Sequence, residues 1–218
     1  WAKVTPIGLT PGPKQFHCMA FDKNRKMVVL FGGWDTNNET DSSIWEYDGL
    51  HWSKISTDGP VARIGAATVY DSKRNRVILH GGGNPTNGEF LGDTWAWDGF
   101  EWTLLSDTGP QTYYHMMAYD SVRDEVVVFG GLSSHTSSLL ETWEWDGINW
   151  TSFDSSPNGP EARAFSGMAF NAKSEKVVLF GGGSMWQDYM AGKILDDTWE
   201  WNGNHWTRIE VEGPSARM

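Results

Sequence analysis

Short apolar runs alternate with polar turns along the whole chain, and no segment keeps the 3.6-residue period of an amphipathic helix. One kind of run is rich in Val, Leu and Phe and ends in two glycines, as in residues 27–33. A second kind mixes small and bulky apolar residues and ends in Asp or Asn, as in residues 64–71. Runs of about five such residues between turn signals are typical of buried strands. The pattern predicts an all-β protein.

A pair of tryptophans with six residues between them recurs four times, and each pair straddles an Asp-Gly or Asn-Gly dipeptide. The pairs are Trp45/Trp52, Trp95/Trp102, Trp143/Trp150 and Trp199/Trp206. Asp-Gly supplies the positive φ angles of a tight hairpin turn, and the tryptophans stand where cross-strand aromatic pairs form. The pairs follow one another at 50, 48 and 56 residues. A fixed period of this size indicates an array of one supersecondary unit.

Each unit is expected to contain four antiparallel strands, here called a to d. Strand a ends in Asp22, Asp71, Asp120 or Asn171, strand b ends in the paired glycines, and strands c and d form the tryptophan hairpin. Gly33 and its counterparts are expected where strand b turns into its loop, some of them with a positive φ angle, which a β-branched residue cannot adopt at low cost.

These features resemble the kelch repeat, in its prokaryotic style with the Asp-Thr-Trp-x-Trp-Asp-Gly-x-x-Trp segment of residues 93–102. All four units carry the small-residue strand a, the double glycine after strand b, and an aromatic residue followed at a fixed spacing by a Trp. The resemblance therefore covers essentially the whole chain. It implies a β-propeller, in which each four-stranded antiparallel unit is one blade.

The unit boundaries predict one domain over residues 1–218 with four complete blades, at 13–57, 60–107, 110–155 and 160–211. Residues 1–9 are interpreted as a lone N-terminal outer strand d, and residues 213–218 as the start of a fifth repeat. Kelch propellers usually have six or seven blades, which needs roughly 300–350 residues at this period. The favoured interpretation is a portion of a longer propeller. The alternatives are two copies that each supply half a ring, and a small or open propeller.

The charge and the apolar segments limit the classes of partner. The chain has 28 acidic and 17 basic residues, for a net charge of −11, so phosphate backbones and anionic lipid would repel it. No apolar run is long enough to cross a bilayer. We therefore expect no nucleic acid partner and no membrane insertion. Open strand edges at both ends favour self-association. A bacterial protein in an extracellular or periplasmic location is slightly favoured over a cytoplasmic one.

The loops between strands b and c vary most, so the ligand face is expected on the b–c and d–a loops. From the last glycine of strand b to the first Trp of the hairpin there are 12, 13, 12 and 17 residues. The longest loop contains Trp186, Asp188 and Tyr189, whose rings and carboxylate suit a sugar or a peptide. The alternative is that these aromatics only anchor the loop. Trp34 and Asp35 occupy the comparable place in the first loop.

A basic position at the start of strand a is a second candidate site. Aligning the units puts Lys14, Arg63, Thr112 and Arg163 at this position, and His17, Ala66, His115 and Ser166 three residues further on. Basic groups around a channel mouth could bind a carboxylate ligand. The structural alternative is an ion pair with the neighbouring blade, for which Asp93, Glu141 and Asp197 are the expected partners.

No catalytic residue, metal site or cofactor is assigned. His17 and His115 alone are too few for a tetrahedral metal site, and Cys18, inside an apolar strand, is interpreted as a buried small hydrophobe. The sequence therefore favours a non-enzymatic binding or scaffolding propeller that recognises a protein or a glycan. The resemblance also implies an alternative, a carbohydrate-active kelch enzyme similar to sialic-acid epimerases or galactose oxidases, with Asp188 and Asp197 as the acids to test.

Overall fold

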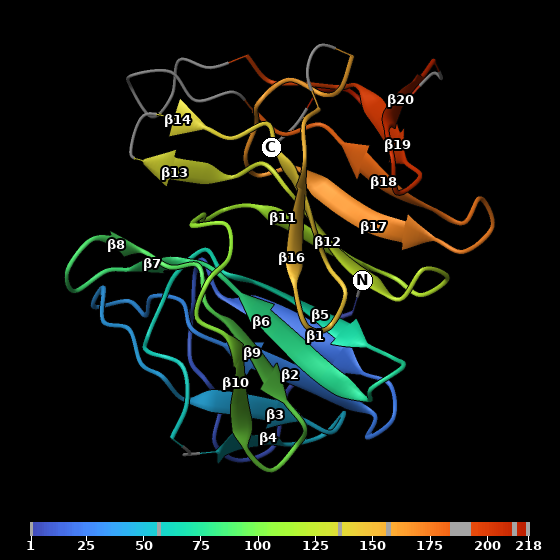
Figure 1. The fold of residues 1–218 in the computed structure, drawn as a ribbon. Coiled ribbons are helices and arrows are strands. Elements are labelled where there is room, and N and C mark those ends of the chain that lie inside the picture. The colour runs from blue at the N-terminus through green and yellow to red at the C-terminus, as the bar shows by residue number, and fades with distance from the viewer. Residues whose placement is uncertain are drawn as a thin grey trace.

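The computed structural model describes residues 2–55, 58–134, 137–155, 158–183, 193–210 and 213–216. In this part of the chain there are no helices, and four antiparallel sheets of four strands follow one another along the sequence (Figure 1). The first sheet contains β1 (Cys18–Asp22), β2 (Met27–Phe31), β3 (Ile44–Tyr47) and β4 (Trp52–Ile55). The second contains β5 (Ala67–Asp71), β6 (Arg76–His80), β9 (Thr94–Trp97) and β10 (Trp102–Ser106).

The third sheet contains β11 (Met116–Asp120), β12 (Glu125–Phe129), β15 (Thr142–Trp145) and β16 (Trp150–Phe153). The fourth contains β17 (Gly167–Asn171), β18 (Lys176–Phe180), β19 (Thr198–Trp201) and β20 (Trp206–Ile209). Every sheet has its strands side by side in chain order. Two small hairpins, β7 (Gly83–Asn84) with β8 (Glu89–Phe90) and β13 (Leu132–Ser134) with β14 (Ser137–Ser138), extend the segments between the second and third strands. The predicted all-β fold and the a-to-d strand order are confirmed.

Local chemistry explains the turns of each sheet. At the turn after β1 the Asp22 carboxylate accepts a hydrogen bond from the backbone N–H of Arg25 at 2.9 Å, as Asx side chains do in turns. In the hairpin between β3 and β4, Gly49 has a φ angle of 103°, which glycine adopts without a Cβ penalty.

The sheets pack face to face, and each junction buries an apolar cluster. At the first junction Val77, Leu79 and Trp97 of the second sheet lie against Phe31 and Ile44 of the first. The second and third sheets, and the third and fourth, also meet through clusters of buried apolar side chains. Because side chains alternate between the two faces of a strand, the second and third sheets each use one face for the sheet before and the other for the sheet after.

The paired glycines after the second strands have the predicted geometry. Gly33, Gly82, Gly131 and Gly182 have φ angles of 83°, 102°, 88° and 87°. A Cβ on Gly33 would lie 2.7 Å from the backbone oxygen of Gln15 and 2.8 Å from the backbone nitrogen of His17. Gly33 therefore allows both the turn after β2 and a close approach of the segment that precedes β1.

The two small hairpins, β7–β8 and β13–β14, project on the left of Figure 1, whereas β17 runs to the right toward its turn with β18. The variable loops and the short uniform turns thus lie at opposite ends of these sheets. At the N-terminus, the expected outer strand is represented by a single parallel bridge between Ile7 and His51. Residues 213–216 form no strand. The described residues contain no helix of a kind that could cross a membrane.

Candidate ligand-binding pocket

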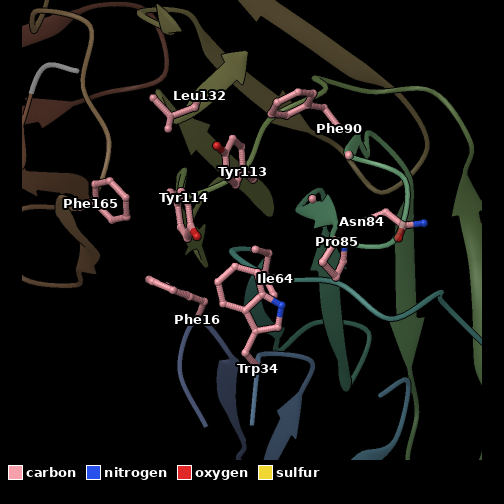
Figure 2. Close-up of a pocket in the computed structure, with 12 residues that line it drawn as sticks. Phe16, Trp34, Ile64, Asn84, Pro85, Phe90, Tyr113, Tyr114, Leu132 and Phe165 are labelled. Atoms are coloured by element: carbon pink, nitrogen blue, oxygen red, sulfur yellow. The ribbon is translucent and has the colours of Figure 1, made fainter. Parts of the chain in front are cut away.

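A cavity of about 490 Å³ opens at the end of the sheets where the variable loops lie. Figure 2 shows Trp34 and Phe16 along its lower edge, Phe90 and Tyr113 at the top, and Phe165 at the left. The remaining lining residues are Ile64, Gly83, Asn84, Pro85, Gly88, Tyr114 and Leu132. All of them lie in segments that precede the first strand or follow the second strand of a sheet. We call this cavity the aromatic pocket.

The floor of the aromatic pocket is formed by Phe16, Tyr114 and Phe165, which share with Gly65 one repeat position and a left-handed backbone. Phe16, Gly65, Tyr114 and Phe165 have φ angles of 59°, 61°, 55° and 58°. Such angles are uncommon for bulky residues and cost on the order of 1 kcal/mol each. The backbone N–H of Gly65 donates to Phe16 O at 2.9 Å, that of Tyr114 to Gly65 O at 2.7 Å, and that of Phe165 to Tyr114 O at 3.3 Å. This chain of hydrogen bonds ties the four sheets together beneath the pocket.

The second repeat makes the hollow because glycine replaces a bulky residue at two positions. Gly65 takes the place of the aromatic at the floor position. Gly83 takes the place held by Trp34 in the first repeat and Leu132 in the third, directly after the double glycine. A Cβ on Gly83 would meet the Tyr113 ring at 3.7 Å, an ordinary contact, so a side chain there would enter the pocket without disturbing the backbone.

The lining is aromatic and carries no formal charge. Six of its twelve residues are Phe, Tyr or Trp, and none is Asp, Glu, Lys, Arg or His. Their rings form a continuous series, with centroids 5.7 Å apart for Trp34–Phe16, 5.1 Å for Phe16–Tyr114 and 4.6 Å for Tyr114–Phe165. A ligand group in this pocket would lose water and gain apolar contact on several sides, which favours an uncharged group.

Trp34 and Asp35, the candidates from the first variable loop, are separated by the structure. Trp34 lines the pocket, and its backbone exchanges hydrogen bonds of 2.9 and 3.0 Å with Gln15. The Asp35 carboxylate instead accepts hydrogen bonds from the backbone N–H groups of Glu39 and Asn37, at 2.9 and 2.8 Å. These bonds lower the pKa of the Asp35 carboxyl group. Asp35 therefore holds its own loop in shape beside the pocket.

Arg63 and Arg163 do not line the aromatic pocket and are buried in ion pairs. Both arginine side chains have no exposed surface. The Arg63 guanidinium donates to both carboxylate oxygens of Asp93, at 2.6 and 2.9 Å, and Arg163 donates to Asp197 at the same distances. Each also donates to the first glycine carbonyl of its repeat, at Gly81 or Gly181.

The structural alternative for this basic position is confirmed for these two arginines, but the expectation that the partner lies in the neighbouring blade is wrong. Arg63 and Asp93 both flank the second sheet, since one precedes β5 and the other precedes β9. Burial opposes ionisation of Asp93, yet the Arg63 hydrogen bonds outweigh it and keep the pKa of the carboxyl below its usual value. Lys14, at the same repeat position, lies 3.9 Å from Asp41, with its own side chain only 5% exposed.

The candidates of the long fourth loop, Trp186, Asp188 and Tyr189, lie outside the described residues. Asp197, the second acid of the catalytic alternative, is occupied by Arg163 and also accepts a hydrogen bond from Trp199 Nε1 at 2.7 Å.

A smaller cavity of about 190 Å³ lies on the other side of the left-handed residues. It brings together the four residues that the repeat alignment placed at one position, His17, Ala66, His115 and Ser166. His115 is buried, with neither ring nitrogen hydrogen-bonded, and its ring lies 5.5 Å from that of His80. Burial lowers the pKa of His115 to about 3 and that of His80 to about 4, so both rings are neutral at pH 7.

His80 is buried, with its ring nitrogens 3.0 Å from Thr94 Oγ1 and 3.1 Å from Pro110 O. Cys18 is also buried as expected, and burial raises the pKa of its thiol to about 12. In the part of the chain that the structure describes, no cluster of three or more His, Cys, Asp or Glu side chains is arranged to hold a metal ion.

The sequence analysis identified one lining residue of the aromatic pocket, Trp34, but did not identify the residues that form its floor. Phe16, Tyr114 and Phe165 share one repeat position, between the basic residue and the histidine, and three aromatics in register were a readable signal. Phe90 and Pro85 belong to the β7–β8 hairpin alone, so no repeat comparison singles them out. A scan against protein-family models and a search of curated proteins found no match to this chain.

Proposed function

We propose that the chain is a kelch-type β-propeller whose role is non-enzymatic binding. In this proposal the aromatic pocket captures an uncharged aromatic, prolyl or aliphatic side chain presented by a protein segment. The observation that carries it is the lining itself, with six aromatic residues and no charged one around about 490 Å³. Pockets of this size and character are where proteins usually bury ligand groups, and aromatic anchors dominate the affinity of such contacts.

Two further features support a propeller with a binding face. The packing of four-stranded antiparallel sheets in chain order, each against the next, is the arrangement that the kelch resemblance implies. The pocket lies on the b–c and d–a segments, whose loops vary in length while the strands repeat. Binding residues on variable loops above a rigid scaffold are common in repeat proteins.

A protein segment suits this lining better than a glycan. A sugar has an apolar face that stacks on aromatic rings, but its hydroxyl groups need hydrogen-bond partners once water is removed. Asn84 and the two tyrosines are the polar side chains in the lining, and no carboxylate belongs to it. A hydrophobic side chain has no such requirement.

Saturation-transfer NMR with small neutral probes tests this function. The probes are the N-acetyl amides of tryptophan, phenylalanine, leucine and proline, compared with those of lysine and aspartate and with methyl glycosides. We expect transfer to the neutral aromatic and apolar amides. Transfer to the glycosides alone would move the proposal to a glycan ligand, and transfer to none of the probes would contradict a pocket for uncharged groups.

The variant Gly83→Leu tests whether the probes bind in the aromatic pocket. Leucine occupies the same repeat position at Leu132, so the backbone accommodates it, and its side chain would fill the pocket. We expect Gly83→Leu to abolish the signal while thermal unfolding stays close to that of the wild type. Phe100→Ala, at an 82% exposed hairpin position, is the matched control and should leave the signal unchanged.

A further inference from the structure

A second cavity, of about 350 Å³, lies at the junction between the second and third sheets. Its lining comes from the end of β10 and the loop after it, and from the hairpin of β15 and β16. The lining residues are Ser106, Thr108, Gly109, Trp143, Trp145, Ile148, Asn149 and Trp150, and none of them lines the aromatic pocket. Both sheets pack against a neighbour on each side, so the cavity belongs to an internal junction. We call it the Trp143 cleft.

The second sheet leaves room for the Trp143 cleft because its last strand contains a β-bulge. The register of β10 against β9 shifts after Leu104, and the small Ser106 then stands opposite Thr94. In the other three sheets the residue at this place is large and apolar, namely Ile55, Phe153 or Ile209. Bulges are over-represented next to functional sites, where they change the direction of side chains.

On the side of the third sheet, Trp150 forms a fixed aromatic wall. Its counterparts at the other internal junctions, Trp102 and Trp206, are 8% and 5% exposed, whereas Trp150 is only partly buried. The indole N–H of Trp150 donates to Thr94 Oγ1 at 3.0 Å, so this ring is held in place beside the cleft.

The ring of Trp143 lacks the long side chain that stands beside its counterparts. In the other three sheets the residue directly across the hairpin from this tryptophan is Lys54, Leu104 or Arg208. The Lys54 ammonium lies 5.9 Å from the centre of the Trp45 ring. In the third sheet the residue across from Trp143 is Ser152, which is too short to cover an indole. The ring face is therefore left for a ligand.

The indole N–H of Trp143 also lacks the partner that two of its counterparts have. Trp95 Nε1 donates to Asp93 at 2.6 Å, and Trp199 Nε1 donates to Asp197 at 2.7 Å. At the equivalent place before Trp143 stands a glutamate, and within the described ranges Trp143 Nε1 makes no hydrogen bond. A tryptophan of this kind can stack on a ligand ring and donate to one of its substituents at the same time.

The rest of the lining is polar but uncharged. Ser106, Thr108 and Asn149 supply hydroxyl and amide groups, and none of the described residues around the cleft is Asp, Glu, Lys, Arg or His. Ser106 Oγ donates to Thr108 O at 2.6 Å and so holds its loop, whereas Thr108 and Asn149 are exposed. Hydroxyls and amides both donate and accept hydrogen bonds, which the hydroxyl groups of a sugar need once water is removed.

We propose that the Trp143 cleft binds a neutral sugar ring of a β-linked oligosaccharide. The C–H face of a hexose with equatorial hydroxyl groups stacks on the Trp143 indole, one hydroxyl accepts the indole N–H, and Thr108 and Asn149 bond further hydroxyls at the rim. The volume of about 350 Å³ is small for a ligand site and suits a mono- or disaccharide unit. A proline ring would also stack on the indole but would leave the polar rim without partners. Sugar binding here is independent of side-chain capture in the aromatic pocket.

Isothermal titration calorimetry with cellotriose and chitotriose, two neutral β-linked trisaccharides, tests this site. We expect binding of at least one of them. Ser152→Arg should weaken it about tenfold or more, because the arginine covers the Trp143 ring that anchors the ligand. The fold should be kept, since Ser152 is exposed and Arg208 occupies the same repeat position. Leu104→Arg, at this repeat position in the second sheet and 46% exposed, is the matched control and should bind like the wild type.

Proton–nitrogen correlation spectra of the indole N–H groups locate the bound sugar. Trp143→Phe identifies the Trp143 signal by its loss. We expect this signal to shift when the trisaccharide is added to the wild type. The signals of Trp95 and Trp199, whose N–H groups are bonded to aspartates, should stay in place.

Gly83→Leu separates the Trp143 cleft from the aromatic pocket. It fills the aromatic pocket, so sugar binding should be unchanged in this variant, and Ser152→Arg should still bind the neutral amides. Four results would each overturn the proposal. They are no binding of either trisaccharide, sugar binding that Gly83→Leu abolishes, equal affinity in Ser152→Arg and the wild type, and capture of a triproline amide in preference to both sugars.

Discussion

The indole N–H of Trp97, on the second sheet, donates a 2.8 Å hydrogen bond to the carboxylate of Glu46, on the first. The same oxygen of Glu46 lies 2.7 Å from a guanidinium nitrogen of Arg25. Trp201 and Glu144 repeat this relationship at 2.6 Å between the fourth and third sheets, with Arg123 as the cation. Between the second and third sheets the carboxylate is missing, since Ala96 stands there, and the buried Trp145 Nε1 has no hydrogen-bond partner.

Ala96→Glu should therefore stabilise the protein. The new carboxylate would accept the Trp145 N–H and lie near Arg74, as Glu46 and Glu144 do with their partners. Satisfying one buried donor contributes about 1 kcal/mol, so the urea midpoint should rise. Ala96→Gln is the control that keeps the hydrogen bond but not the charge. A variant with glutamate that is less stable than the wild type would show that Arg74, already paired with Asp71 and Asp124, leaves no place for a third carboxylate.

Arg63→Met should cost about 3–5 kcal/mol of unfolding free energy, because it leaves the partly buried Asp93 carboxylate without its cation. Lys14→Met changes the same repeat position, where the lysine nitrogen lies 3.9 Å from the 43% exposed Asp41, and should cost under about 1 kcal/mol. Chemical denaturation of both variants measures the difference. Equal losses would contradict the view that the buried pair, rather than the position, stabilises the repeat.

Acid should weaken the fold through His80 and His115 once the pH falls below about 6.5. Burial places the folded-state pKa values at about 4 and about 3, below the usual 6.5, so the unfolded chain binds these protons first. Stability is then complete above pH 6.5 and falls as the pH drops toward 4, by up to about 1.4 kcal/mol per pH unit for each ring. Glu125, whose pKa burial raises to about 7, opposes this loss over the same range.

His80→Phe isolates the histidine contribution, because Glu125 is present in both proteins. Phenylalanine stands at the same repeat position in Phe31, Phe129 and Phe180. Urea midpoints measured from pH 7.5 to 4.5 should fall less steeply for the variant than for the wild type. Parallel profiles would show that His80 accepts its proton without cost in the folded state.

Gly33→Ala should destabilise the protein far more than Gly49→Ala. Both glycines have positive φ angles, 83° and 103°, so both substitutions carry a backbone cost of about 1 kcal/mol. Only at Gly33 would the new Cβ clash with the backbone of Gln15 and His17, adding roughly 1–3 kcal/mol. Thermal unfolding separates the two effects. Equal shifts for both variants would contradict the close approach of the two segments at Gly33.

The sequence also explains where the regular hydrogen-bond pattern fails. Trp102 stands at the repeat position of Trp150 and Trp206, but Ile44 replaces the threonine that would accept its N–H, and Trp102 Nε1 is buried without a partner. Once the repeat register is known, such gaps can be located from the residue types alone. The sheet that supplies the acceptor could not be predicted from the sequence, because the acceptor depends on how neighbouring sheets pack.

The sequence by itself determined the strands, their order within each unit, and the turns at Gly33 and Gly49. These features depend on backbone angles and side-chain alternation over a few residues, so local residue types specify them. Tertiary structure decided the rest. It brought Phe16, Tyr114 and Phe165 to one floor and buried Arg63 against Asp93 of its own repeat. Those outcomes depend on packing between residues 30 or more positions apart in the sequence, which no local preference encodes.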